Sequence, residues 1–148
     1  MKRNILVTSL LLIPFLFSNL LNAQESDIKK YENGTVLISY IGTYLGQNFE
    51  SSNEPYSPYL LGVYYDDNPD GEINPRMYRI PIKKNGITWA KYTNVNGEIK
   101  KGDPITSSAE PGLAMKATEP GVILGIALED AVNPNGLVKI RVMIQYMR

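Results

Sequence analysis

Residues 97–129 read GEIKKGDPITSSAEPGLAMKATEPGVILGIALE, and turn dipeptides cut this stretch into short apolar runs at nearly even intervals. Pro111-Gly112 and Pro120-Gly121 each join a residue whose φ is fixed at about −65° to one that tolerates positive φ. This pairing is typical of a type II turn, so we expect a sharp bend at each, with positive φ at Gly112 and Gly121. The stretch predicts a compact β module and contains no recognisable catalytic motif.

The rest of the chain continues the pattern of short strands and turns. Turn residues form Asn-Pro-Asp-Gly at 68–71, Asn-Pro-Asn-Gly at 133–136 and an Asn-Gly pair at 96–97. We therefore predict an all-β fold, a small barrel or sandwich of about six to seven short strands, with a β-clip-like arrangement as one option. The strand-like runs are rich in β-branched and aromatic residues and lie at 35–41, 59–65, 77–82, 87–92, 122–128 and 137–146.

The first 23 residues have the pattern of a secretory signal peptide. Lys2 and Arg3 precede a mostly apolar run at 5–16, and Ala23 supplies a small residue before the expected cleavage point. An uncleaved membrane anchor is the alternative, but polar residues interrupt the run, and a bilayer span needs about 20 apolar residues. We expect a chain that is secreted, periplasmic or on the cell surface, with no membrane span after cleavage, a flexible lead-in at 24–33 and a single β domain at 34–148. A short helix is conceivable only at 24–31.

Composition excludes several classes of function. Cleavage would remove Lys2 and Arg3 from 15 basic and 15 acidic residues, leaving 13 and 15 and a formal charge of −2. That balance gives no reason to expect a nucleic-acid partner. The chain has no cysteine and no histidine, so disulfides, thiol catalysis, zinc ribbons and the commonest general base are all absent.

One catalytic arrangement remains open. Ser107 or Ser108 could form a Ser–Lys dyad with Lys116, because a desolvated lysine can act as a base, and the chain would then be an autoprocessing or hydrolytic enzyme. The alternative is a solvated lysine near turn serines, which we favour because the sequence does not indicate that these groups are buried.

The acidic segment at 66–74 resembles part of a calcium-binding loop. Asp66, Asn68 and Asp70 are spaced like the first ligands of such a loop, with Gly71 following. Met77 occupies the position where a bidentate glutamate would close the site. The segment therefore predicts either a weak calcium site or a plain acidic turn, and the turn is favoured. We expect no other cofactor.

Aromatic residues are the best sequence indication of a contact surface. The chain contains ten tyrosines and one tryptophan, and such side chains combine apolar area with a polar tip that suits recognition faces. Tyr64, Tyr65, Trp89 and Tyr92 are the candidates for binding a partner. The alternative is that these residues form ordinary cross-strand pairs inside the domain.

The final strand also suggests self-association. Residues 137–146 alternate apolar and polar side chains and lie close to the end of the sequence, so a following strand is not available to cover the far edge. Long uncovered strand edges favour pairing with another chain. We therefore expect a homo-oligomer, with closed cyclic symmetry as the usual solution. The alternative is a monomer in which the charges of Lys139, Arg141 and Arg148 protect the edge.

The order of short motifs resembles a known type of β module. It runs from Gly34-Thr-Val-Leu-Ile through Tyr78-Arg-Ile-Pro-Ile to the stretch at 97–129. This order resembles the β modules of phage tail-fibre-like and bacterial surface proteins, which are related to the β-rich region of autoprocessing intramolecular-chaperone domains. The resemblance covers about 34–146, with 97–129 as its most specific part. It implies a role in assembly or display and trimeric relatives.

Together these observations predict an exported, non-catalytic β module. It would serve surface or periplasmic assembly, or bind a protein or glycan partner at the cell surface, through its aromatic residues. The alternatives are the Ser–Lys enzyme and a weak calcium-binding module.

Overall fold

The computed structural model describes residues 31–39, 49–67 and 81–148, and within these residues the protein is all-β without a helix. The described residues belong to one compact unit, Tyr31–Arg148. That unit begins at Tyr31, three residues before Gly34. The Tyr31 hydroxyl donates a hydrogen bond to the Phe49 carbonyl oxygen (3.1 Å). The Asn33 side-chain amide forms hydrogen bonds with the backbone carbonyl oxygen and N–H of Asp66. The predicted signal peptide at 1–23 and most of the lead-in lie outside the described residues, as does the conceivable helix at 24–31 except for Tyr31.

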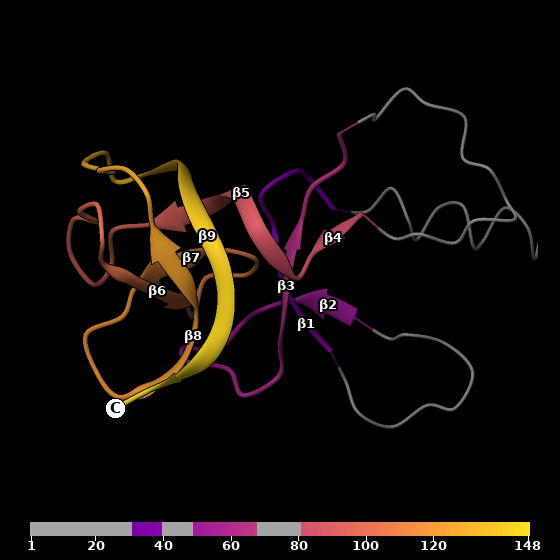
Figure 1. The fold of residues 1–148 in the computed structure, drawn as a ribbon, viewed down its shortest axis with the longest axis horizontal. Helices are drawn as coiled ribbons and strands as arrows, with labels where there is room; N and C mark the ends of the chain where they lie inside the picture. Colours follow the sequence, from indigo (N-terminus) through magenta and orange to yellow (C-terminus); the bar gives the residue numbers. More distant parts are fainter. Residues whose placement is uncertain (1–30, 40–48, 68–80) are drawn as a thin grey trace, which may run out of the picture. The chain divides into compact units, whose positions relative to one another are not determined.

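The first four strands form an antiparallel sheet with the order β2-β1-β3-β4 (Figure 1). β1 is one of the two inner strands of this sheet, and its first three residues are apolar and buried, as expected for a strand covered on both faces. The bounds are β1 (Val36–Ser39), β2 (Phe49–Ser51), β3 (Leu60–Tyr64) and β4 (Ile82–Lys83).

The remaining five strands close into a barrel with the order β5-β7-β6-β8-β9, in which β9 returns to pair with β5. All neighbouring pairs are antiparallel except β5 and β7, which run parallel. The bounds are β5 (Asn85–Thr93), β6 (Pro104–Ser107), β7 (Ala114–Lys116), β8 (Gly121–Ala127) and β9 (Asn135–Met147).

The prediction of a small all-β fold is confirmed, although the described residues contain nine strands rather than six or seven. The strands outside the predicted runs are short: β2, β6 and β7 have three, four and three residues. Runs of this length carry too little alternation to be recognised from sequence. Most of the predicted run at 77–82 lies outside the described residues, and β4 begins at its last residue.

The expectation that the far edge of the last strand is open along its length is wrong for the middle of the strand. β9 pairs with β5 from Asn135 to Met143 and with β8 from Ile140 to Met147, so it lies between two strands at residues 140–143 (Figure 1). Its first five residues extend beyond the ladder with β8. Only its last four residues extend beyond β5. Barrel closure covers both edges of the middle of β9, so an uncovered edge is confined to the two ends of the strand.

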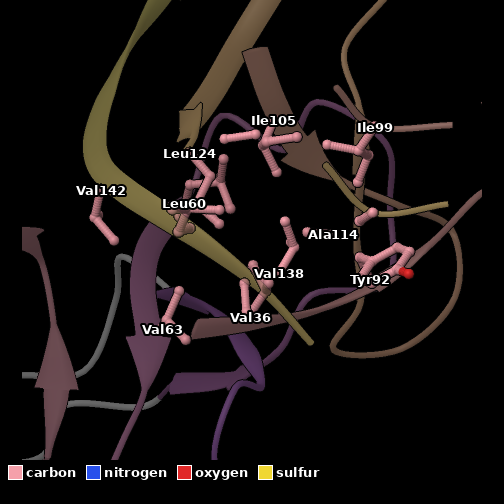
Figure 2. Packing of buried hydrophobic residues seen from close by; sticks show 14 of the residues in the cluster. Val36, Leu60, Val63, Tyr92, Ile99, Ile105, Ala114, Leu124, Val138 and Val142 are labelled. Carbon is pink, nitrogen blue, oxygen red and sulfur yellow. The ribbon is translucent and has the colours of Figure 1, made fainter. Parts of the chain in front are cut away.

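One hydrophobic core joins the sheet to the barrel. Val36 and Val63 from the sheet pack in the same cluster as Val138 from β9 (Figure 2). Alternation along β9 places Val138, Ile140 and Val142 inward, each at most 2% exposed. Backbone hydrogen bonds add to this contact, because Lys91 N–H donates to the Gly34 carbonyl oxygen and Val36 N–H donates to that of Gly112, at 2.8 and 2.9 Å.

The two Pro-Gly turns differ from each other in the structure. Gly112 has a φ of +73°, as predicted, and its N–H donates to the Ser52 carbonyl oxygen at 2.7 Å. The expectation of positive φ at Gly121 is wrong, because this residue begins β8 and is not among the glycines with positive φ. Glycine is required there for space: a Cβ would lie 2.6 Å from Cδ1 of Tyr56.

Tyr56 lies in the segment between β2 and β3 and holds that segment against the barrel. Its ring covers Gly121, and its hydroxyl oxygen accepts hydrogen bonds from the backbone N–H groups of Thr118 and Glu119, at 2.8 and 2.9 Å. Tyr56 adopts a φ of +54°, which costs free energy for a residue with a side chain. These contacts hold that backbone conformation in place.

Gly121→Ala should lower the free energy of unfolding by about 1 to 3 kcal/mol, because its methyl group overpacks against the Tyr56 ring. In a Tyr56→Ala background the same substitution should cost less than about 0.5 kcal/mol, since the ring is gone. Urea unfolding of the wild type, both single variants and the double variant measures the coupling. An equal cost of Gly121→Ala in both backgrounds would show that the ring is not the obstacle.

Candidate functional site

The serines of the candidate dyad are occupied by structural hydrogen bonds. Ser107 is fully buried in β6, and its hydroxyl oxygen accepts the backbone N–H of Ser57 at 3.0 Å. The Ser108 hydroxyl bonds carbonyl oxygens of Glu110 and Leu113, at 3.1 and 2.9 Å, within the turn that leads to β7. The Ser107 hydroxyl therefore holds the segment between β2 and β3 against β6, and the Ser108 hydroxyl stabilises the turn between β6 and β7.

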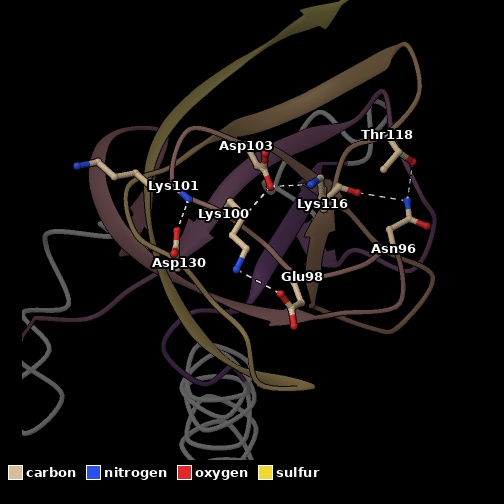
Figure 3. Close-up of polar contacts among 8 residues, drawn as sticks. All are labelled: Asn96, Glu98, Lys100, Lys101, Asp103, Lys116, Thr118 and Asp130. Carbon is tan, nitrogen blue, oxygen red and sulfur yellow. Dashed lines mark hydrogen bonds and ion pairs between the residues drawn. The ribbon is translucent and has the colours of Figure 1, made fainter.

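Lys116, the base of the candidate dyad, forms an ion pair with Asp103 instead. Its Nζ lies 2.9 Å from Asp103 Oδ2, and the register places Lys116 opposite Ile105 rather than opposite Ser107 (Figure 3). Burial acts to raise the pKa of Asp103, but the hydrogen bonds from Lys116 Nζ and the Lys100 N–H, with the two lysine charges, outweigh it and hold the pKa below its ordinary value. An ammonium group bound to a carboxylate is a poor general base.

Of the three candidate calcium ligands, only Asp66 lies within the described residues. Asn68 and Asp70 lie outside the described residues, and Asp66 is described with its backbone bonded on both sides by the Asn33 side chain. The adjacent Asp67 carboxylate forms an ion pair with Lys83 Nζ at 2.8 Å. Among the described residues no group of three or more acidic side chains could hold a metal ion.

The structure separates the four candidate aromatic residues into two pairs. Tyr64 and Tyr92 are buried, at 6% and 3% exposure, so their side chains offer no contact surface in this chain. Burial raises the pKa of Tyr64, and the charge of Asp66 adds to the effect. Tyr65 and Trp89 lie at the surface, where their ring centroids are 5.9 Å apart and Trp89 is 38% exposed. The candidate contact surface therefore narrows to Tyr65 and Trp89.

Trp89 lies at the centre of a larger exposed surface, which we call the Trp89 face. It consists of the outward side chains of β5 and β9, together with Tyr65. The strand register places three apolar side chains opposite basic ones, because Ile87 pairs with Arg141, Trp89 with Lys139, and Leu137 with Lys91. Met143 lies opposite Asn85. The strand residues of this face are Ile87, Trp89, Lys91, Leu137, Lys139, Arg141 and Met143.

The charge on the Trp89 face is positive. β5 and β9 carry three basic residues on this face and no carboxylate anywhere along their length. Lys91 is neutralised by an ion pair with Glu32, and that contact lowers the pKa of the Glu32 carboxyl. Lys139 Nζ lies over the Trp89 ring at 5.3 Å, and neither Lys139 nor Arg141 forms an ion pair with a described residue.

Sequence reasoning did not include the three basic residues of this face, Lys91, Lys139 and Arg141, among the candidate contact residues. The notable signal was the alternation of Leu137, Lys139, Arg141 and Met143, which predicts that all four point to one side of a strand. This alternation does not show which strand lies beside these residues. The register with β5 depends on barrel closure, which brings Trp89 beside Lys139 across about 50 residues of chain.

No family model, curated protein or solved structure matches this chain. Within the described residues, no helix exists that could cross a membrane. Function is therefore inferred from the side chains of the Trp89 face and from the charge around them.

Asp103→Asn should lower the free energy of unfolding by about 1 kcal/mol near pH 7, because it removes the ion pair with Lys116. The pKa of Asp103 is lower in the folded chain, so the stabilisation is complete above the unfolded pKa of about 3.9 and is lost as the pH falls through the folded value. The difference between variant and wild type should therefore shrink as the pH falls below about 3.9 and vanish once the folded carboxyl is protonated.

Urea unfolding at several pH values measures this difference. Glu98→Gln is the matched control, because Glu98 pairs with Lys100 through two side chains that are each more than half exposed. It should change stability by less than about 0.5 kcal/mol at every pH. A difference for Asp103→Asn that persists unchanged at low pH would contradict a role for the ionised carboxylate.

Proposed function

We propose that this chain is an exported, non-catalytic β module that contacts a protein or glycan partner at the cell surface or in the periplasm through the Trp89 face. The observation that carries the proposal is the exposed indole of Trp89, with Tyr65 beside it and two basic side chains without ion pairs among the described residues. Tryptophan, tyrosine and arginine are the residues that most often dominate binding energy at interfaces.

The position of the Trp89 face favours binding because the backbone beneath it is rigid. β5 and β9 pair over nine consecutive positions, from Asn85↔Met143 to Thr93↔Asn135. Their inward side chains, including Ala90, Val138 and Ile140, are buried in the core. A face held by a continuous ladder loses little conformational entropy when a partner binds.

The resemblance to tail-fibre-like and bacterial surface modules supports the same proposal. Modules of that type act in assembly or display, which requires a stable domain with a contact surface rather than a catalytic centre. The candidate dyad gives no support to the enzyme alternative, since Ser107 and Lys116 are engaged in separate structural contacts.

Trp89→Ala should weaken binding to envelope material of the source organism roughly tenfold or more, as expected for loss of a central aromatic anchor. Co-sedimentation of the purified secreted chain with fractionated envelope protein and envelope polysaccharide measures the binding. Tyr59→Ala is the matched control: Tyr59 is 46% exposed, and it precedes β3 while Tyr65 follows it. Equal binding by wild type and Trp89→Ala would contradict the proposal.

Self-association is part of the proposed role in assembly, and its basis is narrower than the whole last strand. Residues 144–147 of β9 pair with β8 but extend beyond the last β5 partner, and they carry no charge that would discourage edge pairing. Ile144 and Tyr146 are exposed there. The second copy of the chain would add a strand at this short edge.

Light scattering should give a mass of two or more chains, and Ile144→Lys should shift the mass toward that of one chain by placing a charge at the edge. Val132→Lys is the control, because Val132 is an exposed loop residue outside the strands. A wild-type mass of one chain across a wide concentration range would rule out the oligomer.

A further inference from the structure

The Trp89 face places a stacking surface and a positive charge close enough for one ligand unit to contact both. Lys139 Nζ lies 5.3 Å from the centroid of the Trp89 ring. Arg141 is two residues further along the same strand, which puts its attachment point about 7 Å away on the same side. A matching ligand needs a face that stacks on an indole and an anionic group beside it.

We propose that the Trp89 face binds a linear polysaccharide that carries carboxylate groups. This proposal rests on the proposed function and names the chemical class of its ligand. In an acidic sugar unit, the C–H face of the ring can pack on the electron-rich face of the indole while the carboxylate reaches Lys139 or Arg141. Glutamate or aspartate in a peptide supplies the charge without a ring face.

The strand pairing also favours a polysaccharide over a peptide strand. Along residues 85–93 of β5 and 135–143 of β9, the facing edges are paired with each other, so a peptide cannot add a strand between them. Recognition on this face must come from side chains alone. An extended chain of sugar rings offers a stacking face and a charge in every unit, and the alternating apolar and basic side chains match that repetition.

The local charge fits an anionic ligand although the chain as a whole is not basic. The full sequence has equal numbers of acidic and basic residues. Among the described residues, two carboxylates bond the β5 and β9 residues of the face: Glu32 pairs with Lys91, and Glu129 accepts the backbone N–H of Lys139 at 2.8 Å. The side chains of Lys139 and Arg141 are left to attract a negative partner.

Binding would also change the surroundings of Trp89. A ligand carboxylate that attracts Lys139 Nζ moves it away from the Trp89 indole. The sugar ring then packs on the part of the indole that Lys139 had covered. Since Trp89 is the only tryptophan in the sequence, its fluorescence reports on this face alone. Polygalacturonate is a suitable carboxylated probe, with dextran as the neutral polysaccharide and polyglutamate as the acidic peptide.

Titration of the secreted chain with polygalacturonate should change the Trp89 fluorescence saturably, with weaker binding at high salt. Dextran and polyglutamate should bind at least tenfold more weakly. Lys139→Gln combined with Arg141→Gln should reduce the affinity for polygalacturonate at least tenfold. Lys100→Gln combined with Lys101→Gln removes the same charge from a turn outside the face and should leave affinity within twofold.

Affinity electrophoresis in gels containing each polymer provides a second measurement and extends the test to Trp89→Ala, which should lose the retardation by polygalacturonate. The proposal is overturned if polygalacturonate does not bind, if polyglutamate or dextran binds as tightly, or if the Lys139 and Arg141 substitutions have no effect. Envelope binding that depends on Trp89 without polygalacturonate binding would overturn the ligand class and leave the proposed function intact. If neither Trp89-dependent envelope binding nor polygalacturonate binding is observed, both the proposed function and the ligand class are overturned.

Discussion

The pairing of β9 with two neighbours is the constraint on which the rest of the structure depends. Along its length β9 forms ladders with β5 and with β8, and these two ladders close the barrel. Closure fixes which side chains face inward, and it sets the register that brings Trp89 beside Lys139. The core and the exposed face are therefore two sides of one strand arrangement, because alternate residues of a strand point in opposite directions.

The fold class was predictable because the chain is divided by turn residues that have a defined backbone preference. Pro111-Gly112 adopts the expected geometry, and β1, β3, β8 and β9 lie within or close to the predicted runs. The errors have physical causes. Gly121 was interpreted as a turn glycine, whereas it is needed for the approach of an aromatic ring from a segment 65 residues away in sequence. Such a contact leaves no local pattern.

The candidate site was predictable in part. Trp89 and Tyr65 were chosen for their residue type, and the structure places both at the surface. Tyr64 and Tyr92 were chosen for the same reason and are buried. Tyr64 lies between Val63 and Tyr65, so alternation does not show which side of that strand faces the core. Tyr92 lies between Lys91 and Thr93, and alternation there favours an inward tyrosine. The sequence could not place Lys139 and Arg141 beside Trp89 and Ile87, because the register between β5 and β9 is defined only in the closed barrel.

The place of β9 in the chain has a consequence for biosynthesis. β5 finds its long partner only when residues 135–143 are available, and β8 depends on the same strand. A chain that emerges from its N-terminus first thus cannot complete the barrel until its last strand has been made. Contacts of such sequence separation also form slowly. For the exported chain proposed above, this late closure would delay completion of the barrel until the whole domain has crossed a translocation channel.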